Sequence, residues 1–278
     1  MTQFPDKSLF FEKYKSGVSQ VLWVELVADL ETPVSAMLKL TKNEPYSFLL
    51  ESVEGGKVRG RYSVLGFDPD LIWRCFGEKS EISEITDGKP SNFVTCDEKS
   101  LESLSSLISS SQIDLPEDVP PSAVGLFGYM GYDMIRLMEN IPDSNPDVIG
   151  IPDSIFIRPT ITAVFDNVAD KITLVTPVWP NPKVNEEEAY NIAKNRLNKA
   201  IKNLDNVVSA KTLSAITSSQ VLPQAVSNTT REGYHLMVKK AKEYIRAGDI
   251  FQVVPSQRFT LPLKASPMAL YRSLRRLN

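Results

Sequence analysis

The strongest constraint on the fold is a glutamine inside an apolar run late in the sequence. Residues 250–254 read IFQVV and follow Gly248, a residue type that commonly stands just after a helix. A short apolar run of this kind is typical of a buried strand, and a buried amide such as Gln252 costs about 1–3 kcal/mol unless its two donors and its acceptor find partners. We therefore expect a strand over residues 250–261, with a polar site at Gln252.

A second informative segment is a pair of apolar stretches at residues 48–54 and 61–67. A Gly-Gly pair lies between them, which predicts an antiparallel hairpin. The first stretch contains the string LLES, and the second begins with RYS. The LLES string is therefore expected on the first strand of this hairpin, and Arg61 on the second.

The string GDIFQVV, together with LLES followed by RYS, resembles segments of the large subunit of anthranilate synthase, in the chorismate-utilising enzyme family. The resemblance implies an α+β fold. Residues 1–205 would form an N-terminal domain of antiparallel sheet and helices, and residues 229–278 the first helix, strand and helix of the chorismate-binding domain. Residues 206–228 are expected to link them. In the family the sequence continues beyond Asn278, so we expect this chain to be an incomplete and inactive part of the enzyme.

The resemblance also implies an activity, that of a lyase of tryptophan biosynthesis. The enzyme would convert chorismate and ammonia into anthranilate and pyruvate with Mg²⁺, take ammonia from a glutamine amidotransferase partner subunit, and be inhibited by L-tryptophan. The family's catalytic histidine and its Mg²⁺ ligands are expected beyond Asn278, so no metal ligand is assigned within the chain. Aminodeoxychorismate synthase, which retains the pyruvyl group, and a non-catalytic amino-acid-sensing module are the alternatives.

Gln252 stands where relatives that add water to chorismate have a lysine, which acts as their general base. Glutamine does not accept a proton at neutral pH, but it can orient a nucleophile through hydrogen bonds. Ammonia needs no deprotonation before it attacks. The resemblance therefore implies that Gln252 positions ammonia. The alternative is an amide that only satisfies neighbouring backbone groups.

Leu50, Glu51 and Ser52 correspond in the family to the site at which tryptophan inhibits the enzyme. An amino acid presents an ammonium group and a carboxylate, for which a carboxylate, a hydroxyl and a cation are suitable partners. Glu51 and Ser52 supply the first two, and Arg61 is the candidate cation. The alternative is that Glu51 and Ser52 are only an outward polar pair at a strand end.

The composition excludes other classes of function. A net charge of −3 argues against a nucleic-acid partner, for which a basic surface would be expected. The N-terminus lacks the regions of a signal peptide, and no stretch approaches the ~20 apolar residues of a membrane span. Cys75 and Cys96 make neither a metal-ligand pattern nor a disulfide framework. We expect a cytoplasmic protein that binds neither nucleic acid nor membrane.

The remaining pattern predicts further strands and helices. Residues 186–204 carry apolar side chains at helical spacing behind three glutamates, which favour a helix N-terminus. Gly125, Gly128 and Gly131 recur every three residues, which indicates close backbone packing. The other expected strands are residues 21–30, 71–76, 155–165 and 171–178, and the other expected helices begin after Thr32, near Leu101, after Thr230 and after Ser266.

Overall fold

The computed structural model describes residues 6–42, 44–54, 58–86, 88–208, 224–263 and 265–277. The chain divides into two compact units, Met1–Ser209 and Ala210–Asn278, which we call the N-terminal unit and the C-terminal unit. Each unit is described by itself. Residues 209–223, which belong to the expected linker, lie outside the described residues.

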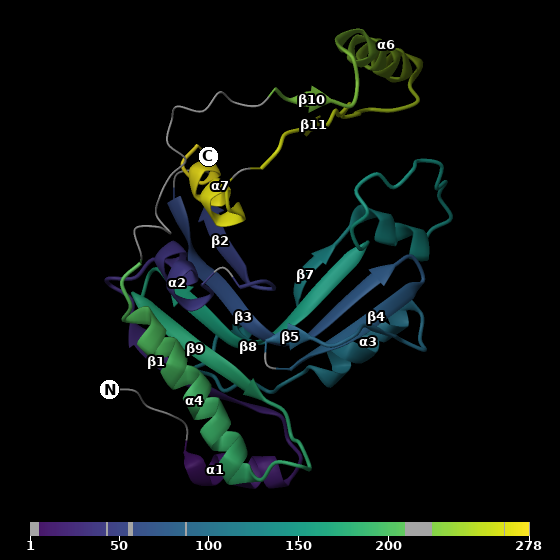
Figure 1. Cartoon of the computed structure of the whole chain (residues 1–278). Helices are drawn as coiled ribbons and strands as arrows, with labels where there is room; N and C mark the ends of the chain where they lie inside the picture. Colours follow the sequence, from purple (N-terminus) through teal and green to yellow (C-terminus); the bar gives the residue numbers. More distant parts are fainter. Residues whose placement is uncertain are drawn as a thin grey trace. The chain divides into compact units, whose positions relative to one another are not determined.

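The N-terminal unit is built on an antiparallel sheet, which confirms the predicted α+β class (Figure 1). Its strands follow the order β1 (Gln20–Val27), β9 (Lys171–Val178), β8 (Ser154–Asp166), β3 (Val58–Phe76), β4 (Lys79–Thr86) and β5 (Lys89–Pro90). Further strands pair beside this path, namely β2 (Phe48–Glu54) with β3, β6 (Val94–Thr95) with β4, and β7 (Phe127–Met130) with β8. The long strands β3 and β8 pair along most of their length and so connect both ends of the sheet.

The predicted strands of this unit are found, with one difference. Residues 61–67 and 71–76 belong to a single strand, β3, instead of two. The strand bends at Asp68, whose backbone has a φ of +48°, and its pairing with β8 shifts register just beyond that point. Thr160 Oγ1 donates a hydrogen bond to the Asp68 carbonyl oxygen (2.5 Å), which ties β8 to the bend.

One face of the sheet is covered by the helices α1 (Lys7–Lys15), α2 (Pro33–Leu40) and α4 (Glu186–Leu204), and α4 runs along β1 and β9 (Figure 1). The helix expected at residues 186–204 is thus confirmed. Asn185 caps it by accepting a hydrogen bond from the Glu188 N–H (2.8 Å). The buried stripe of α4 packs with strand residues such as Leu22 and Leu65 in the largest apolar cluster.

The opposite face of the strands that pack with α4 is covered by an irregular segment. Residues 113–124 cross it and include a short 3-10 helix, η1 (Pro121–Ala123). Val119 and Ala123 are buried in one cluster with Val64 of β3. The central strands are therefore enclosed on both faces, which explains their near-continuous apolar sequence.

Beyond the bend, β3 contributes to a separate apolar cluster around Trp73. This side chain is fully buried, and its Nε1 donates a hydrogen bond to Ser103 Oγ (3.0 Å) of α3 (Ser100–Ser110). Met134 of η2 (Tyr132–Leu137) is buried in the same cluster. The bent strand therefore anchors different cores on either side of its bend.

Two of the three repeated glycines lie where backbones approach closely, as predicted. A Cβ atom on Gly128 would lie 1.8 Å from the Ile155 carbonyl oxygen, and one on Gly131 would lie 2.7 Å from the Asp153 carbonyl oxygen. Both contacts bring the β7 region against β8. Gly125 differs, because a Cβ atom there would meet nothing within 4 Å, while its φ of +153° disfavours other residues.

The C-terminal unit contains β10 (Val226–Ser227), α6 (Arg231–Ala247), β11 (Phe259–Thr260) and α7 (Pro267–Leu274). Helix α6 begins at Thr230, whose side chain accepts a hydrogen bond from the Gly233 N–H (3.0 Å), and it ends at Gly248, where φ is +83°. Helix α7 begins after Ser266, which caps it in the same way. The helix starts predicted for this unit are therefore confirmed.

The prediction of a strand at residues 250–261 is wrong for most of that range. Only Phe259–Thr260 is a strand, and the irregular residues 251–258 leave Phe251 and Gln252 exposed. A strand needs a hydrogen-bonded neighbour, and in the described part of this unit only β10 pairs with the segment. Helix α6 is likewise not enclosed, since none of its described residues is buried.

Candidate functional site

The LLES string lies in β2, opposite the first half of β3, as the predicted hairpin requires. Leu50 pairs with Val64, and Glu51 pairs with Ser63. Val64 belongs to the apolar cluster under residues 113–124, and successive strand residues point to opposite faces. Leu50 and Glu51 therefore point to opposite faces of the sheet. Among the described strands β2 pairs only with β3, so a ligand could reach both faces around its outer edge.

The pairing of β2 with β3 shifts register beside Ser52. It is regular up to Glu51 and resumes at Val53, opposite Arg59. At the shift, a Cβ atom on Gly60 would lie 2.2 Å from Ser52 Oγ and 2.4 Å from Ser52 Cβ. Only glycine therefore leaves room for the Ser52 side chain in this arrangement.

The polar side chains of the LLES string differ in whether they interact with other residues of the protein. Ser52 is exposed, and its hydroxyl makes no hydrogen bond with the described residues. Glu51 is half-buried and has an interaction partner. Leu50, on the same face as Ser52 by strand alternation, is 55 % exposed. On this face, the hairpin thus presents the Ser52 hydroxyl, which is available for hydrogen bonds, and the exposed Leu50 side chain.

Arg61, the candidate cation, is held by a carboxylate of the protein. Its Nε lies 3.2 and 3.1 Å from the two carboxylate oxygens of Asp166, and its Nη2 donates to Asp166 Oδ2 (2.8 Å). The hydrogen bonds from Arg61 lower the pKa of Asp166 to about 2. The guanidinium also lies over the Tyr62 ring, 4.9 Å from its centroid. The charge of Arg61 is therefore largely neutralised before any ligand arrives.

The turn between β8 and β9 forms hydrogen bonds with the backbone of β3 at the register shift. Asn167 Nδ2 donates a hydrogen bond to the Gly60 carbonyl oxygen (2.9 Å), and the Asn167 N–H donates to the Arg61 carbonyl oxygen (2.8 Å). Asp166 Oδ1 shapes the same turn by accepting from the Val168 N–H (3.0 Å). The segment that faces Ser52 is thus fixed from the side opposite to β2.

Gly60 and Asn167 were missed as site residues by the sequence analysis. The pair Asp166 and Asn167 reads only as turn chemistry between two strands. The available signal was Gly60, because a glycine inside a strand often marks close approach of another chain segment. That signal points to the approach of Ser52 and gives no sign of the hydrogen bond from Asn167, which lies 107 positions away.

Gln252 lies in the C-terminal unit, in the irregular segment that follows α6. Its side chain is exposed, and its amide makes no hydrogen bond with the described residues. The segment is held at its far end, where the Arg258 N–H donates to Asn228 Oδ1 (2.8 Å). Gln252 therefore neither sits in a buried polar site nor satisfies nearby backbone groups of the described chain, and its role stays a prediction.

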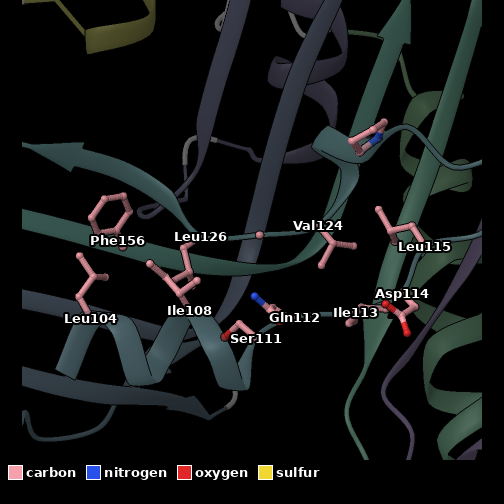
Figure 2. Close-up of a pocket in the computed structure, with 12 residues that line it drawn as sticks. Leu104, Ile108, Ser111, Gln112, Ile113, Asp114, Leu115, Val124, Leu126 and Phe156 are labelled. Carbon is pink, nitrogen blue, oxygen red and sulfur yellow. The ribbon is translucent and has the colours of Figure 1, made fainter. Parts of the chain in front are cut away.

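A cavity of about 500 Å³, which no sequence motif indicated, lies at the end of α3 (Figure 2). It is lined mainly by apolar side chains, including Ile108 of α3, Val124 of the segment 113–124 and Leu126 just beyond that segment. Ser111 contributes a buried hydroxyl, whose oxygen accepts a hydrogen bond from Arg158 Nη1 (3.2 Å). None of the predicted site residues lines this cavity.

Neither a membrane-crossing helix nor a metal-binding cluster is found in the described part of the chain. Among them, no helix has the length and apolar character needed to cross a membrane. Nor do three His, Cys, Asp or Glu side chains of the described chain gather so that they could hold a metal ion. No ligand for the Mg²⁺ that the resemblance implies is therefore assigned among the described residues.

Comparison with known sequences gives consistent matches along the chain. Over 278 residues it is 46 % identical to anthranilate synthase component 1 of Cereibacter sphaeroides, with 100 % of this chain and 55 % of that relative covered. Over 282 residues it is 38 % identical to anthranilate synthase component 1 of Synechocystis sp., with 99 % of this chain and 54 % of that relative covered. The chain thus spans about half the length of the curated relatives it matches.

A solved structure and a family description agree with these relatives. Anthranilate synthase component I from Streptococcus pneumoniae matches the fold with a TM-score of 0.56 at 24 % identity, covering 91 % of this chain and 52 % of that one. Residues 46–278 match the family described as chorismate binding enzyme. Because this match extends over most of the chain, the protein belongs to the chorismate-binding enzyme family.

Proposed function

We propose that the chain is part of the large subunit of an anthranilate synthase, a cytoplasmic lyase of tryptophan biosynthesis. This enzyme converts chorismate and ammonia into anthranilate and pyruvate, and a glutamine amidotransferase subunit supplies the ammonia. The observation that carries the proposal is the 46 % identity, along the whole chain, to a relative named anthranilate synthase component 1. Mg²⁺ is the cofactor that membership of this enzyme class implies.

Within that function, the β2–β3 hairpin is proposed to bind tryptophan as a feedback inhibitor. The Ser52 hydroxyl makes no hydrogen bond with the described residues and suits a charged group of the ligand. Leu50, exposed on the same face, suits the indole ring. Glu51 would meet the ammonium group around the edge of β2. Arg61 donates to Asp166 through Nε and one N–H of Nη2, so its Nη1 and the second N–H of Nη2 would serve the ligand carboxylate.

Gln252 is proposed to orient ammonia for attack on chorismate. Its exposed amide has two donors and one acceptor that make no hydrogen bond with the described residues. An amide does not act as a general base at neutral pH, so it gives little help to competing water. This combination favours addition of an amine that needs no deprotonation.

The proposed function is tested with the complete gene product, chorismate, Mg²⁺ and ammonium. We expect anthranilate and pyruvate to form in equal amounts, followed by anthranilate fluorescence and a coupled pyruvate assay. An aminated product that keeps the pyruvyl group would contradict the proposal and indicate aminodeoxychorismate synthase. Tryptophan binding without turnover of chorismate would instead indicate a non-catalytic sensing module.

A further inference from the structure

The geometry at Ser52 depends on a segment of β3 that β2 does not hold. Regular pairing between β2 and β3 stops at Glu51 and resumes two residues later, while β3 advances by four residues, from Ser63 to Arg59. Gly60 lies within this irregular stretch and packs against Ser52. The position of Ser52 therefore depends on whatever fixes the backbone at Gly60.

That backbone is fixed from the β8–β9 turn. The Gly60 and Arg61 carbonyl oxygens both accept hydrogen bonds from Asn167, one from its side chain (2.9 Å) and one from its backbone (2.8 Å). The Arg61 side chain in turn donates a hydrogen bond to Asp166 (2.8 Å from Nη2 to Oδ2). Successive residues of β3 are thus tied to successive residues of one turn.

We propose that Gly60 and Asn167 are positioning residues for Ser52, so that the β8–β9 turn, without touching the ligand, determines how tightly tryptophan binds at the hairpin. This inference rests on the proposed regulatory role of Ser52. It also gives Arg61 a task in addition to the proposed contact with the ligand, because its side chain holds the turn through Asp166. Asn167 thereby acts on Ser52 through the backbone of Gly60.

The chain offers a matched pair of glycines to test this. Gly60 and Gly66 both lie in β3 and both pack against a residue of β2, since a Cβ atom on Gly66 would lie 2.3 Å from the Phe48 ring. Gly60→Ala should displace Ser52, whereas Gly66→Ala should displace Phe48. Both substitutions disturb the same strand pair, but only the first reaches Ser52.

Asn167→Asp is the second variant, because it keeps the size of the side chain and removes the donor to the Gly60 carbonyl oxygen. Asn181→Asp is its control, since the Asn181 side-chain oxygen accepts from the Lys183 N–H (2.9 Å) and an aspartate keeps that bond.

In the complete gene product, we expect Gly60→Ala and Asn167→Asp to raise the inhibition constant of tryptophan roughly tenfold, equivalent to about 1.4 kcal/mol. Neither control should do so. A merely structural role would lower kcat or the unfolding temperature and leave the inhibition constant unchanged.

A readout that needs no ligand separates this inference from the proposed function. The amide chemical shift of Ser52 should change in Asn167→Asp and stay the same in Asn181→Asp. If that shift does not change, the positioning role is overturned, whatever tryptophan does. If it changes while Ser52→Phe remains fully sensitive to tryptophan, the positioning role holds and the regulatory function of the hairpin is wrong. If Ser52→Phe loses inhibition while Gly60→Ala and Asn167→Asp keep it, the regulatory function holds and the control of affinity by the turn is overturned.

Discussion

The two units of the chain differ in how far their apolar side chains are enclosed. In the N-terminal unit, Leu22, Trp73 and Leu174 have no exposed surface. In the C-terminal unit, the described helices α6 and α7 have no buried residue, and Phe251 and Val254 are exposed. Helices with defined caps nevertheless form in both. Local signals are therefore sufficient to build a helix here, whereas burial and strand pairing require partners from elsewhere in the chain.

Truncating one large side chain in each unit tests the difference in enclosure most directly. Trp73→Ala removes a fully buried ring and its hydrogen bond to Ser103, and should lower the free energy of unfolding by about 3–5 kcal/mol. Phe251→Ala removes a fully exposed ring and should change it by about 0.5 kcal/mol or less. Urea unfolding followed by circular dichroism measures both values. Equal losses would contradict the difference in enclosure.

The same contrast explains which parts of the fold could be predicted from the sequence. The helix at residues 186–204 and the one that begins after Thr230 were found because caps and helical hydrogen bonds join residues within a few positions. The strands at residues 155–165 and 171–178 were found because a tight turn brings their partners together. The strand at residues 250–261 failed because an apolar run does not reveal whether a neighbouring strand is available.

The candidate site shows the same limit at the level of single residues. Leu50, Glu51 and Ser52 were predicted on a strand that pairs as a hairpin, and that arrangement is found. The contact between Gly60 and Asn167 was not predictable, because 107 positions separate the two residues and only the pairing of β3 with β8 brings them together. The Asp-Asn pair at residues 166–167 indicated where the chain reverses, but it did not indicate that Asn167 bonds to Gly60.

The two units are also proposed to carry different tasks, regulation at Ser52 and nucleophile positioning at Gln252. Ser52→Phe should abolish inhibition by tryptophan, because each lost hydrogen bond to a charged ligand group costs about 1.5–3 kcal/mol. Anthranilate formation by the complete gene product should continue. Tryptophan titrations of activity measure the effect, and Ser106→Phe, the same change at an exposed serine of α3, serves as the control. Unchanged inhibition in Ser52→Phe would remove the regulatory assignment.

Gln252→Lys should alter the chemistry and leave the regulation in place. A lysine amine with a pKa lowered from ~10.4 by desolvation beside the substrate could activate water, so that hydroxylated product competes with anthranilate. A tenfold change in this partition needs only about 1.4 kcal/mol of differential barrier. Chromatography of the products formed with and without ammonium measures the partition. Gln257→Lys, in the same exposed segment, is the control. Ammonium-dependent anthranilate formation at an unchanged rate, without hydroxylated product, would reduce Gln252 to a structural amide.

The smallest expected effect is on the ion pair of Arg61 and Asp166, which supplements the apolar core of the N-terminal unit. The hydrogen bonds from Arg61 hold the pKa of Asp166 at about 2, below the ~3.9 of an aspartate in an unfolded chain. Folding therefore favours the charged carboxylate, and its contribution to stability is fully present above about pH 4 and is lost as the pH falls toward 2.

Asp166→Asn should consequently be less stable than the unmodified protein at pH 7, and the difference should shrink between about pH 4 and pH 2. It should stay well below the loss in Trp73→Ala, because the Arg61 side chain is 55 % exposed and exposed ion pairs contribute little. Urea unfolding at a series of pH values gives both curves. A difference that stays constant across the acid range would show that the substitution destabilises through the geometry of the β8–β9 turn instead of through the lost charge.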